Sequence, residues 1–564
     1  MKKWLKGIAG VLLVLVLVLV LAKNYIFLHL PGWLGPHVNE NQPVHWQQGP
    51  ATAEIPADKR PPNIVLIVAD DLGFNDITFN GGGVAGGAMP TPNIDAIGRQ
   101  GVSFANGYAG NATCAPSRAA LMTGRYPTRF GYEFTPTEVH PPKWFPKDLI
   151  RTDAAFARNI ASFKSDWEHK PVFDEEAAEL PATTAPKGVP ASEETAAELL
   201  QKRGYHTVHL GKWHLGDAKG MRPEQQGFNE SLGFMIGGQM FLPENSPDVV
   251  NSKQDFDPID KFLWANLPFS VQYNGSPPFH PDKYMTDYLT DQAVASIKAN
   301  RNRPFFMYLA YNAAHTPLQA LKSDYDSLPQ IRDHRMRVYA AMIKALDRGI
   351  GRVMAELKAQ GLDENTLVIF TSDNGGAHYI GLPEINRPYR GWKATFFEGG
   401  THVPFFMRWP AQIKPGTVLS SPVSHFDIFA TAGAAGQAAL PTDRAIDGVN
   451  LLPFIEGRAT GRPHQTLFWR SGGYRVVIDG DWKYQSLGFG HKQYLFNLKD
   501  DPTEQRDLAA QQPAKVAEMR TLLAKHDADQ VAPAWPALVR SPIPIDRPLG
   551  TKPRKDETYI YWWN

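Results

Sequence analysis

Four short apolar runs along the chain each end in a cluster of polar residues. They cover residues 63–69, 205–210, 304–310 and 367–370, and they lead into Asp70-Asp71, Gly211-Lys212-Trp213-His214, Tyr311-Asn312-Ala313-Ala314-His315 and Thr371-Ser372-Asp373-Asn374. Continuous apolar runs of this length predict strands that are covered on both faces. Helical periodicity over residues 192–202 and 287–299 precedes two of the runs, as an alternating α/β arrangement requires. We therefore predict an α/β fold, with a large, mostly parallel sheet flanked by helices and ligands bound outside the carboxyl ends of its strands.

A change of pattern after residue 459 predicts a smaller C-terminal unit. Residues 474–484 alternate as a hairpin that turns at Asp479-Gly480, which indicates an antiparallel sheet in an α+β domain. We divide the chain into a targeting segment (1–30), a Pro-rich linker (31–62), the main α/β domain (63–459), the C-terminal domain (460–530) and a tail (531–564). Residues 134–191 and 235–283 are long, Pro-rich and irregular, and they are either walls of a substrate cleft or surface excursions.

The N-terminus carries a targeting element. Lys2, Lys3 and Lys6 precede an apolar run over residues 7–22, which is short for a membrane-spanning helix of about 17–25 residues. A retained signal anchor and a cleaved signal peptide both fit it. Either alternative predicts export to the periplasm or the outside of the cell, and an uncleaved segment would anchor the protein to the inner membrane.

The composition excludes one class of partner and one source of stability. With 43% hydrophobic residues, 20% charged residues and a net charge of +1, the 564-residue chain is an ordinary globular protein without attraction for nucleic acid. The single cysteine excludes an intramolecular disulfide.

Four oxygen-bearing side chains, Asp70, Asp71, Asp373 and Asn374, follow two of the predicted strands directly. Either pair alone is explained by helix capping or by a turn. Together at neighbouring strand ends they predict a site for a hard cation, Ca²⁺ or Mg²⁺, since three crowded carboxylates without a cation would repel each other.

The one cysteine has an unusual setting. A lone cysteine is ordinarily a small buried apolar residue, but Cys114-Ala115-Pro116-Ser117-Arg118 enters a short helix, where backbone amides favour an anion. Together with Thr91-Pro92-Asn93-Ile94-Asp95 and residues 121–126, this motif closely resembles the sulfatase family of the alkaline phosphatase superfamily. The resemblance runs from about residue 63 to residue 508, and it makes residues 63–459 the catalytic domain of an alkaline phosphatase-like fold.

The resemblance implies a cofactor set and a catalytic set. A maturation system would oxidise Cys114 to formylglycine (3-oxoalanine), and Ca²⁺, in preference to Mg²⁺, would be bound by Asp70, Asp71, Asp373, Asn374 and the modified residue. The remaining matches are Arg118 for the arginine that holds the formylglycine hydrate, Lys212 and His214 for the Gly-Lys-Trp-His motif, His315 for the histidine near the leaving group and Lys393 for a sulfate-binding lysine. Residues 480–483 and 494–498 match the family's small terminal domain.

The implied function is hydrolysis of a sulfate monoester, on an aryl sulfate or on a sulfated sugar or polysaccharide. One hydroxyl of the hydrate would attack sulfur with help from Asp373, His315 or Lys393 would protonate the leaving oxygen, and His214 would remove the proton from the second hydroxyl. Three alternatives remain: hydrolysis of phosphodiesters or phosphonate esters at the same site, an inactive tethered binding protein for sulfated glycans, and a structural envelope protein. The sequence does not choose among the possible sulfated substrates.

Overall fold

A computed structural model describes residues 22, 25, 26, 28–30, 32–136, 169–179, 187–488 and 491–564 of the protein. Almost all of the expected targeting run lies outside the described residues. Within them, no helix has both the length and the apolar character needed to cross a bilayer. Residues 32–62, for which we expect a linker, run along the main body, and Trp46 is buried there with its Nε1 donating to Gln292 at 3.0 Å.

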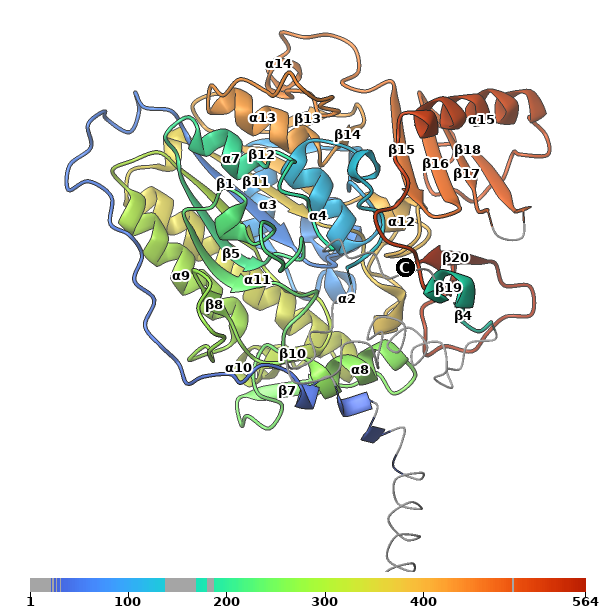
Figure 1. The fold of residues 1–564 in the computed structure, drawn as a ribbon, viewed down its shortest axis with the longest axis horizontal. Coiled ribbons are helices and arrows are strands. Elements are labelled where there is room, and N and C mark those ends of the chain that lie inside the picture. The colour runs from blue at the N-terminus through green and yellow to red at the C-terminus, as the bar shows by residue number, and fades with distance from the viewer. Residues whose placement is uncertain are drawn as a thin grey trace, which may run out of the picture.

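A nine-stranded mixed sheet forms the centre of the main body, in the order β13-β2-β12-β11-β1-β9-β5-β6-β8 (Figure 1). Five adjacent strands of it are parallel: β11 (Thr366–Ser372), β1 (Asn63–Ala69), β9 (Phe305–Ala310), β5 (His206–Lys212) and β6 (Glu230–Phe234). The flanking strands are β12 (Phe405–Arg408), β2 (Val102–Phe104), β13 (Thr417–Leu419) and β8 (Gln272–Tyr273). Since β12 is antiparallel to β11 and β8 to β6, the sheet is mixed but mostly parallel in its middle.

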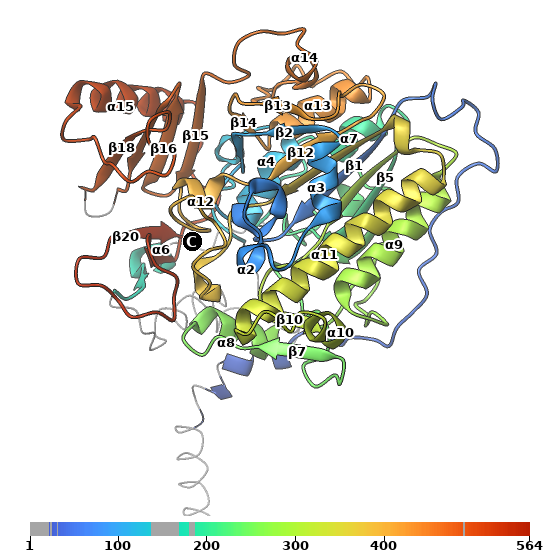
Figure 2. The ribbon, with the colours of Figure 1, turned by 180° about the vertical axis from the view of Figure 1, so that it is seen from behind.

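Helices cover both faces of this sheet, as Figures 1 and 2 show from opposite sides. Alternate residues of β1 enter different clusters: Val65 and Ile67 pack into one, and Leu66 and Val68 into the other, all with no exposed surface. The first cluster includes residues of α3 (Pro92–Arg99), α9 (Met285–Asn300) and α11 (His334–Ala359), and the second includes residues of α4 (Cys114–Thr123), α7 (Ala196–Gln201) and α13 (Asp427–Ala435). Burial on both faces explains why β1 is apolar at every position.

The four predicted strands and both predicted helices are present, so the α/β prediction is confirmed. The prediction that residues 235–283 are irregular is wrong, because they contain β7 (Val249–Ser252), α8 (Pro258–Asn266) and β8. Asp257 caps α8 by accepting hydrogen bonds from the backbone amides of Ile259 and Asp260, and Pro258 opens the helix. Of residues 134–191, the described parts include β4 (Val172–Phe173) and α6 (Glu175–Glu179).

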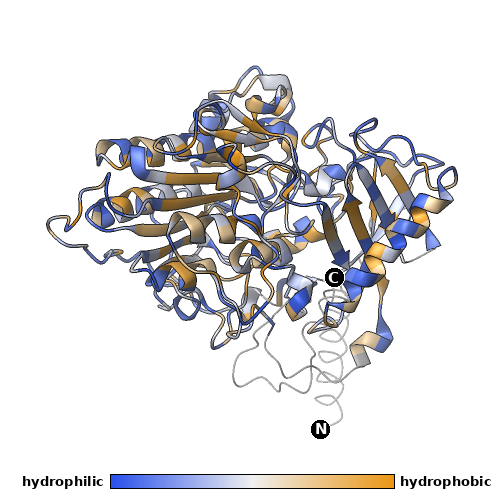
Figure 3. Ribbon diagram, turned by 90° about the horizontal axis from the view of Figure 1, so that it is seen from above, coloured by the Kyte–Doolittle hydropathy of each residue, from blue (hydrophilic) through white to orange (hydrophobic). Residues whose placement is uncertain are grey.

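The C-terminal residues form a separate antiparallel sheet beside the main body (Figure 1). Its strands are β15 (Thr466–Ser471), β16 (Tyr474–Asp479), β17 (Trp482–Ser486) and β18 (Gln493–Asn497), and α15 (Pro513–Ala528) packs on it through Met519. Gly480 has φ of +59° in the turn that joins β16 to β17. The expected tail contains β19 (Val539–Pro544) and β20 (Tyr559–Trp563), which pair with each other and, through β19, with β4. Figure 3 shows that apolar positions are concentrated on the strands of both main sheets.

Candidate functional site

The ends of β1 and β11 bring the four predicted oxygen donors together. These strands are parallel neighbours with Ala69 opposite Ser372, so the residues that follow them share one edge of the sheet. The backbone amide of Asp71 lies 3.2 Å from Asp373 Oδ1, and Asn374 Nδ2 donates to Asp71 Oδ1 at 2.8 Å. Asp71 has φ of +59°, an uncommon conformation for a residue with a side chain.

Cys114 is the first residue of α4 and faces the same carboxylates. Its Sγ lies 3.5 Å from Asp70 Oδ1 and 3.6 Å from Asp71 Oδ1, and only 4% of the residue is exposed. Burial, together with the nearby carboxylate of Asp373, raises the pKa of the thiol well above its ordinary value. As an unmodified thiol, Cys114 is therefore a poor source of thiolate.

Two buried cations contact the carboxylates, one from helix α4 and one from the end of strand β5. Arg118, one turn after Cys114, donates through Nε to Asp373 Oδ2 at 2.8 Å, and its Nη1 donates to both Lys212 O and Tyr308 OH at 3.0 Å. Lys212, at the end of β5, contacts both carboxylate oxygens of Asp70 at 2.8 Å. Neither cationic side chain is exposed.

A third cation approaches from the loop before α12 (Glu398–Thr401). Lys393 Nζ donates to Asp71 Oδ2 at 2.8 Å and to Tyr379 OH at 3.0 Å, and it lies 3.3 Å from His315 Nε2. His315 Nδ1 lies 2.6 Å from the carbonyl oxygen of Thr316, so Nδ1 carries the proton and Nε2 accepts from Lys393. Burial, followed by the charge of Lys393, lowers the pKa of His315 to about 3.

His214 lies two residues beyond Lys212 and close to these groups. It has φ of +60°, and its Nδ1 is buried without a hydrogen-bond partner among the described residues. Burial and then the charge of Lys212 lower its pKa well below the ordinary value. The ring is therefore neutral, and its Nδ1 has no hydrogen-bond partner in the described part of the chain.

The electrostatics of the three carboxylates differ. Burial raises the pKa of Asp70 to about 7 against the opposing charge of Lys212. For Asp373, burial is outweighed by Arg118 and Lys212, which lower its pKa to about 2. For Asp71, burial is likewise outweighed, first by the charge of Lys393, which lowers the pKa well below its ordinary value. Three carboxylates thus face the three cations Arg118, Lys212 and Lys393.

The donor set fits a divalent cation. Asp70, Asp71, Cys114 and His315 each offer an atom, and these atoms lie within 4.8 Å of one another. The set predicted from sequence contains Asp373 and Asn374 in place of His315. Asn374 Oδ1 supports that set, because it is buried without a hydrogen-bond donor in the described structure, while Nδ2 of the same amide is fully bonded. An unpaired buried amide oxygen beside carboxylates is a suitable ligand for Ca²⁺ or Mg²⁺.

All the residues predicted from the sequence lie in or beside this cluster, but Tyr379 and Tyr308 were not predicted. Tyr379 donates to Asp71 Oδ2 at 3.0 Å and accepts from Lys393. It follows Asn374 by five residues in the same loop, yet nothing in its residue type separates it from a core tyrosine. Tyr308 lies within β9, where its apolar neighbours made it part of a buried strand.

Comparisons with known proteins agree on one family. The family model described as Sulfatase matches residues 62–437. Human N-acetylgalactosamine-6-sulfatase is 32% identical over 420 residues, which cover 72% of this chain and 68% of that protein. An uncharacterized sulfatase of Escherichia coli K12, YdeN, is 28% identical over 463 residues, 73% and 69% of the two chains. The crystal structure of Ps i-CgsB in complex with k-i-k-neocarrahexaose has a TM-score of 0.67 and 32% identity, and the match covers 84% of this chain and 95% of that one.

Proposed function

The chain belongs to the sulfatase family of sulfuric ester hydrolases, and we propose that it hydrolyses a sulfate monoester with a formylglycine made from Cys114 and a bound Ca²⁺ ion. The observation that carries this proposal is the distance of 3.5–3.6 Å between Cys114 Sγ and the carboxylates of Asp70 and Asp71. The sulfur marks the place where the oxygens of a hydrated aldehyde would be. A nucleophile and a cation site would then share the same oxygen-rich pocket.

Charge balance supports an anionic substrate. When all three carboxylates are ionised, their charges and those of the three cations cancel, so a divalent cation held by Asp70, Asp71, Asp373 and Asn374 would leave the pocket positive. A cation there supplies fixed positive charge that polarises oxygen atoms next to it. The surplus suits the single negative charge of a sulfate monoester.

The other residues of the site orient residue 114, bind sulfate and transfer protons. Arg118 is held by Asp373 and orients residue 114 from one helical turn away. Lys212 and Lys393 bind sulfate oxygens, and Lys393 with His315 delivers a proton to the leaving oxygen, since their nitrogens lie 3.3 Å apart. His214 is neutral and has a free buried nitrogen, so it is suited to take a proton from a hydroxyl on residue 114.

Mass spectrometry tests the modification directly. The tryptic peptide that ends at Arg118 should show the mass decrease expected when the thiol side chain becomes an aldehyde, with the oxidant supplied by a maturation system of the host. An intact thiol in active protein would exclude this chemistry. Cys114→Ser should lose steady-state turnover, because a serine hydroxyl can accept a sulfuryl group but offers no second hydroxyl to release it. Full retention of the steady-state rate would contradict the release step.

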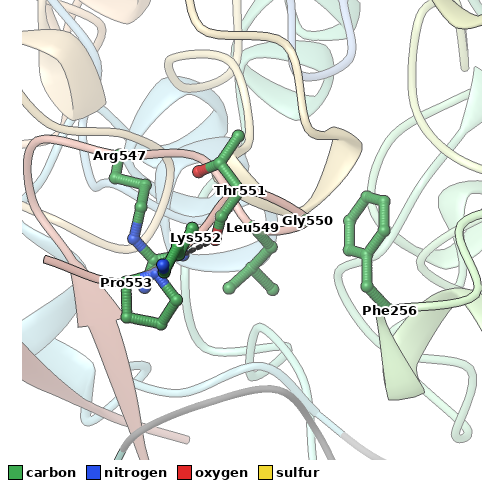
Figure 4. A pocket seen from close by; sticks show the side chains of 7 residues that line it. All are labelled: Phe256, Arg547, Leu549, Gly550, Thr551, Lys552 and Pro553. Atoms are coloured by element: carbon green, nitrogen blue, oxygen red, sulfur yellow. Dashed lines mark hydrogen bonds between the residues drawn. The ribbon is translucent and has the colours of Figure 1, made fainter.

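We further propose that the substrate is a sulfated saccharide. Proteins similar to this chain include a human N-acetylgalactosamine-6-sulfatase and Ps i-CgsB, whose structure is in complex with k-i-k-neocarrahexaose. A cavity of about 210 Å³ in this chain is lined by Phe256, Arg547 and residues 549–553 (Figure 4). Its wall contacts the turn that carries Tyr379, because the amide of Leu549 donates to His378 O at 3.0 Å.

The cavity offers an aromatic ring and a free ammonium group to such a sugar. Lys552 forms no hydrogen bond or ion pair with a described residue, and Phe256 forms the opposite wall. A panel of aryl sulfates and sulfated oligosaccharides, assayed with the parent and with Phe256→Ala, separates the two substrate classes. The variant should raise KM for oligosaccharides and leave aryl sulfates unaffected, whereas equal effects on both would argue against a sugar site.

Two further assays address the competing functions and the location. Matched aryl sulfate and aryl phosphate esters distinguish the proposed activity from phosphoester hydrolysis, and an unmodified Cys114 in the native host would support an inactive binding protein. We propose that the protein is exported and faces the periplasm or the outside of the cell. Protease digestion of intact cells and of spheroplasts checks this, and protection in spheroplasts would contradict it.

A further inference from the structure

Residues 391–401, here called the Lys393 segment, contact two loops of the candidate site. The amide of Lys393 donates to Gly376 O at 3.0 Å, and the amide of Gly375 donates to Gly400 O at 3.0 Å, so the segment lies against the loop of Asn374. The amide of Ala394 donates at 2.7 Å to Ala112 O, two residues before Cys114. Ala394 has φ of +65°, a conformation that the surrounding contacts must maintain.

Side chains from the C-terminal sheet and the loop after it hold the other side of this segment. Tyr474 OH accepts a hydrogen bond from the amide of Phe396 at 3.0 Å, and Glu504 Oε2 accepts one from the amide of Glu398 at 2.6 Å. Lys483 Nζ lies 2.7 Å from Glu398 Oε1 and 2.9 Å from Glu504 Oε1. Lys483, Glu398 and Glu504 are all at least 97% buried as side chains.

Glu398 also links Lys483 and Glu504 to Tyr108 and His402. Glu398 Oε2 accepts from Tyr108 OH at 2.9 Å and contacts His402 Nδ1 at 2.9 Å, while His402 Nε2 lies 2.9 Å from Ala105 O. Both nitrogens of His402 therefore lie at hydrogen-bond distance from oxygen atoms of this group. Burial alone would raise the pKa of Glu398, but Lys483 and then His402 lower it to about 2. Burial raises the pKa of Glu504 to about 7 against the charge of Lys483, so Lys483, Glu398 and Glu504 form a closed, hydrogen-bonded buried group.

A buried ionic group of this kind adds little net stability compared with apolar residues of the same volume, because desolvation offsets the attraction between the charges. Its hydrogen bonds are directional, so they fix the geometry of the groups that they join. In this protein, Tyr474 and Glu504 accept hydrogen bonds from the backbone amides of Phe396 and Glu398, three and five residues after Lys393. The group is therefore better suited to fixing the Lys393 segment than to stabilising the fold.

We propose that Lys483, Glu504 and Tyr474 are positioning residues, which fix the Lys393 segment from the C-terminal unit and thereby hold Lys393 Nζ at Asp71 and His315. The C-terminal unit then contributes to the reaction without touching the substrate. The activity part of this inference rests on the proposed sulfatase function. The structural part, that these side chains hold residues 391–401, does not depend on that function.

Two variants of different severity test the inference. Tyr474→Phe removes one hydroxyl, and Lys483→Met removes the charge between Glu398 and Glu504, while Lys499→Met on the same unit is a matched control because Lys499 is exposed. Misplacing a reacting group by about 1 Å costs up to about 100-fold in rate. We expect Lys483→Met to lower kcat/KM about tenfold to 100-fold and Tyr474→Phe by less, with Lys483→Arg recovering part of the loss and Lys499→Met at the parental value.

The dependence on Lys393 separates positioning from a general structural effect. In a Lys393→Ala background, Tyr474→Phe and Lys483→Met should change kcat/KM less than about twofold, since they act through a group that is already gone. The proposal would be overturned if Tyr474→Phe and Lys483→Met lowered kcat/KM by the same factor in the Lys393→Ala background as in the parent, or if both single variants kept the parental kcat/KM. If the Lys483→Met protein does not fold, the result for Tyr474→Phe alone is decisive.

Hydrogen exchange keeps this test independent of the proposed function. Peptides that cover residues 391–401 should exchange faster in Tyr474→Phe and Lys483→Met than in the parent, with β1 unchanged. If the parent does not hydrolyse aryl sulfates or sulfated saccharides, the proposed function fails while the exchange measurement stands. Unchanged exchange over residues 391–401 in a folded variant would overturn the positioning role whatever the activity.

Discussion

Replacing Asn374 by alanine tests the cation site at the candidate ligand whose oxygen has no other partner in the described structure. The amide is fully buried, its Nδ2 donates to Asp71 Oδ1 at 2.8 Å, and its Oδ1 has no donor among the described residues. The substitution therefore removes one candidate ligand oxygen and the bond that orients another. Changes that only disturb ligand orientation weaken metal binding about 10- to 100-fold, so we expect at least this loss for calcium.

The expected effect on stability follows from linkage. At a free calcium concentration 100 times the parental Kd, binding stabilises the folded state by about 2.7 kcal/mol. A Kd that is 10- to 100-fold weaker leaves about 1.4 to 0.4 kcal/mol at the same concentration. Asn374→Ala should thus lose about 1.3 to 2.3 kcal/mol of calcium-dependent stability, apart from any effect on the metal-free protein.

Urea unfolding followed by tryptophan fluorescence, in EGTA and in calcium, measures this difference. Asn300→Ala is the control, because Asn300 is equally buried but lies at the end of α9, where it accepts from Arg303 Nε at 2.7 Å. It should lower the free energy of unfolding equally in both buffers. The cation assignment would be refuted if calcium stabilised Asn374→Ala as much as the parent, or if it did not stabilise the parent.

Two further substitutions probe other buried charges. Burial raises the pKa of Asp76 to about 8, so the native state keeps a proton that the unfolded chain releases. The free energy of unfolding therefore falls by about 1.4 kcal/mol for each pH unit as the pH rises from about 4 to 8. Asp76→Asn removes this titration, so in urea unfolding the free energy of unfolding of the variant should rise relative to that of the parent between pH 5 and pH 8. A constant difference between the two proteins over this pH range would contradict the prediction. Arg118→Met leaves the buried carboxylate of Asp373 without its cation and should lower the free energy of unfolding by about 3–5 kcal/mol in EGTA, whereas parental stability would mean that Asp373 takes up a proton instead.

The strands and the residues that follow them could be predicted because the information is local. Strand β1 is apolar at every position since both of its faces are covered, and Asp70, Asp71, Asp373 and Asn374 stand where such strands must end. Helix α8 was missed although Asp257-Pro258 is a sound start signal, because the Pro-rich surroundings were interpreted as irregular. Strand β19 contains two prolines, which argue against a strand in sequence.

The positioning contacts could not be predicted because they join distant parts of the chain. Lys483 and Glu398 are 85 residues apart, and Glu504 contacts the amide of Glu398 across 106 residues. A sequence shows a lysine in a hairpin and a glutamate before two glycines, but not that they meet. Tyr379 was missed for a related reason, since a loop tyrosine gains its role only where the loop turns it toward Asp71.

The charge arrangement of the site leads to a last prediction, that anion binding depends on the cation. Lys212 contacts both oxygens of Asp70, and Lys393 contacts Asp71, so both lysines are neutralised by the carboxylates that would hold the cation. A divalent cation at those carboxylates would shift the balance of the pocket toward positive charge and strengthen its attraction for a sulfate oxyanion. Because such coupling is reciprocal, sulfate should also tighten calcium binding by the same factor. Calorimetric titration of inorganic sulfate into the protein should therefore give a lower Kd in calcium than in EGTA, and equal affinities would show that the lysines bind anions without help from the metal.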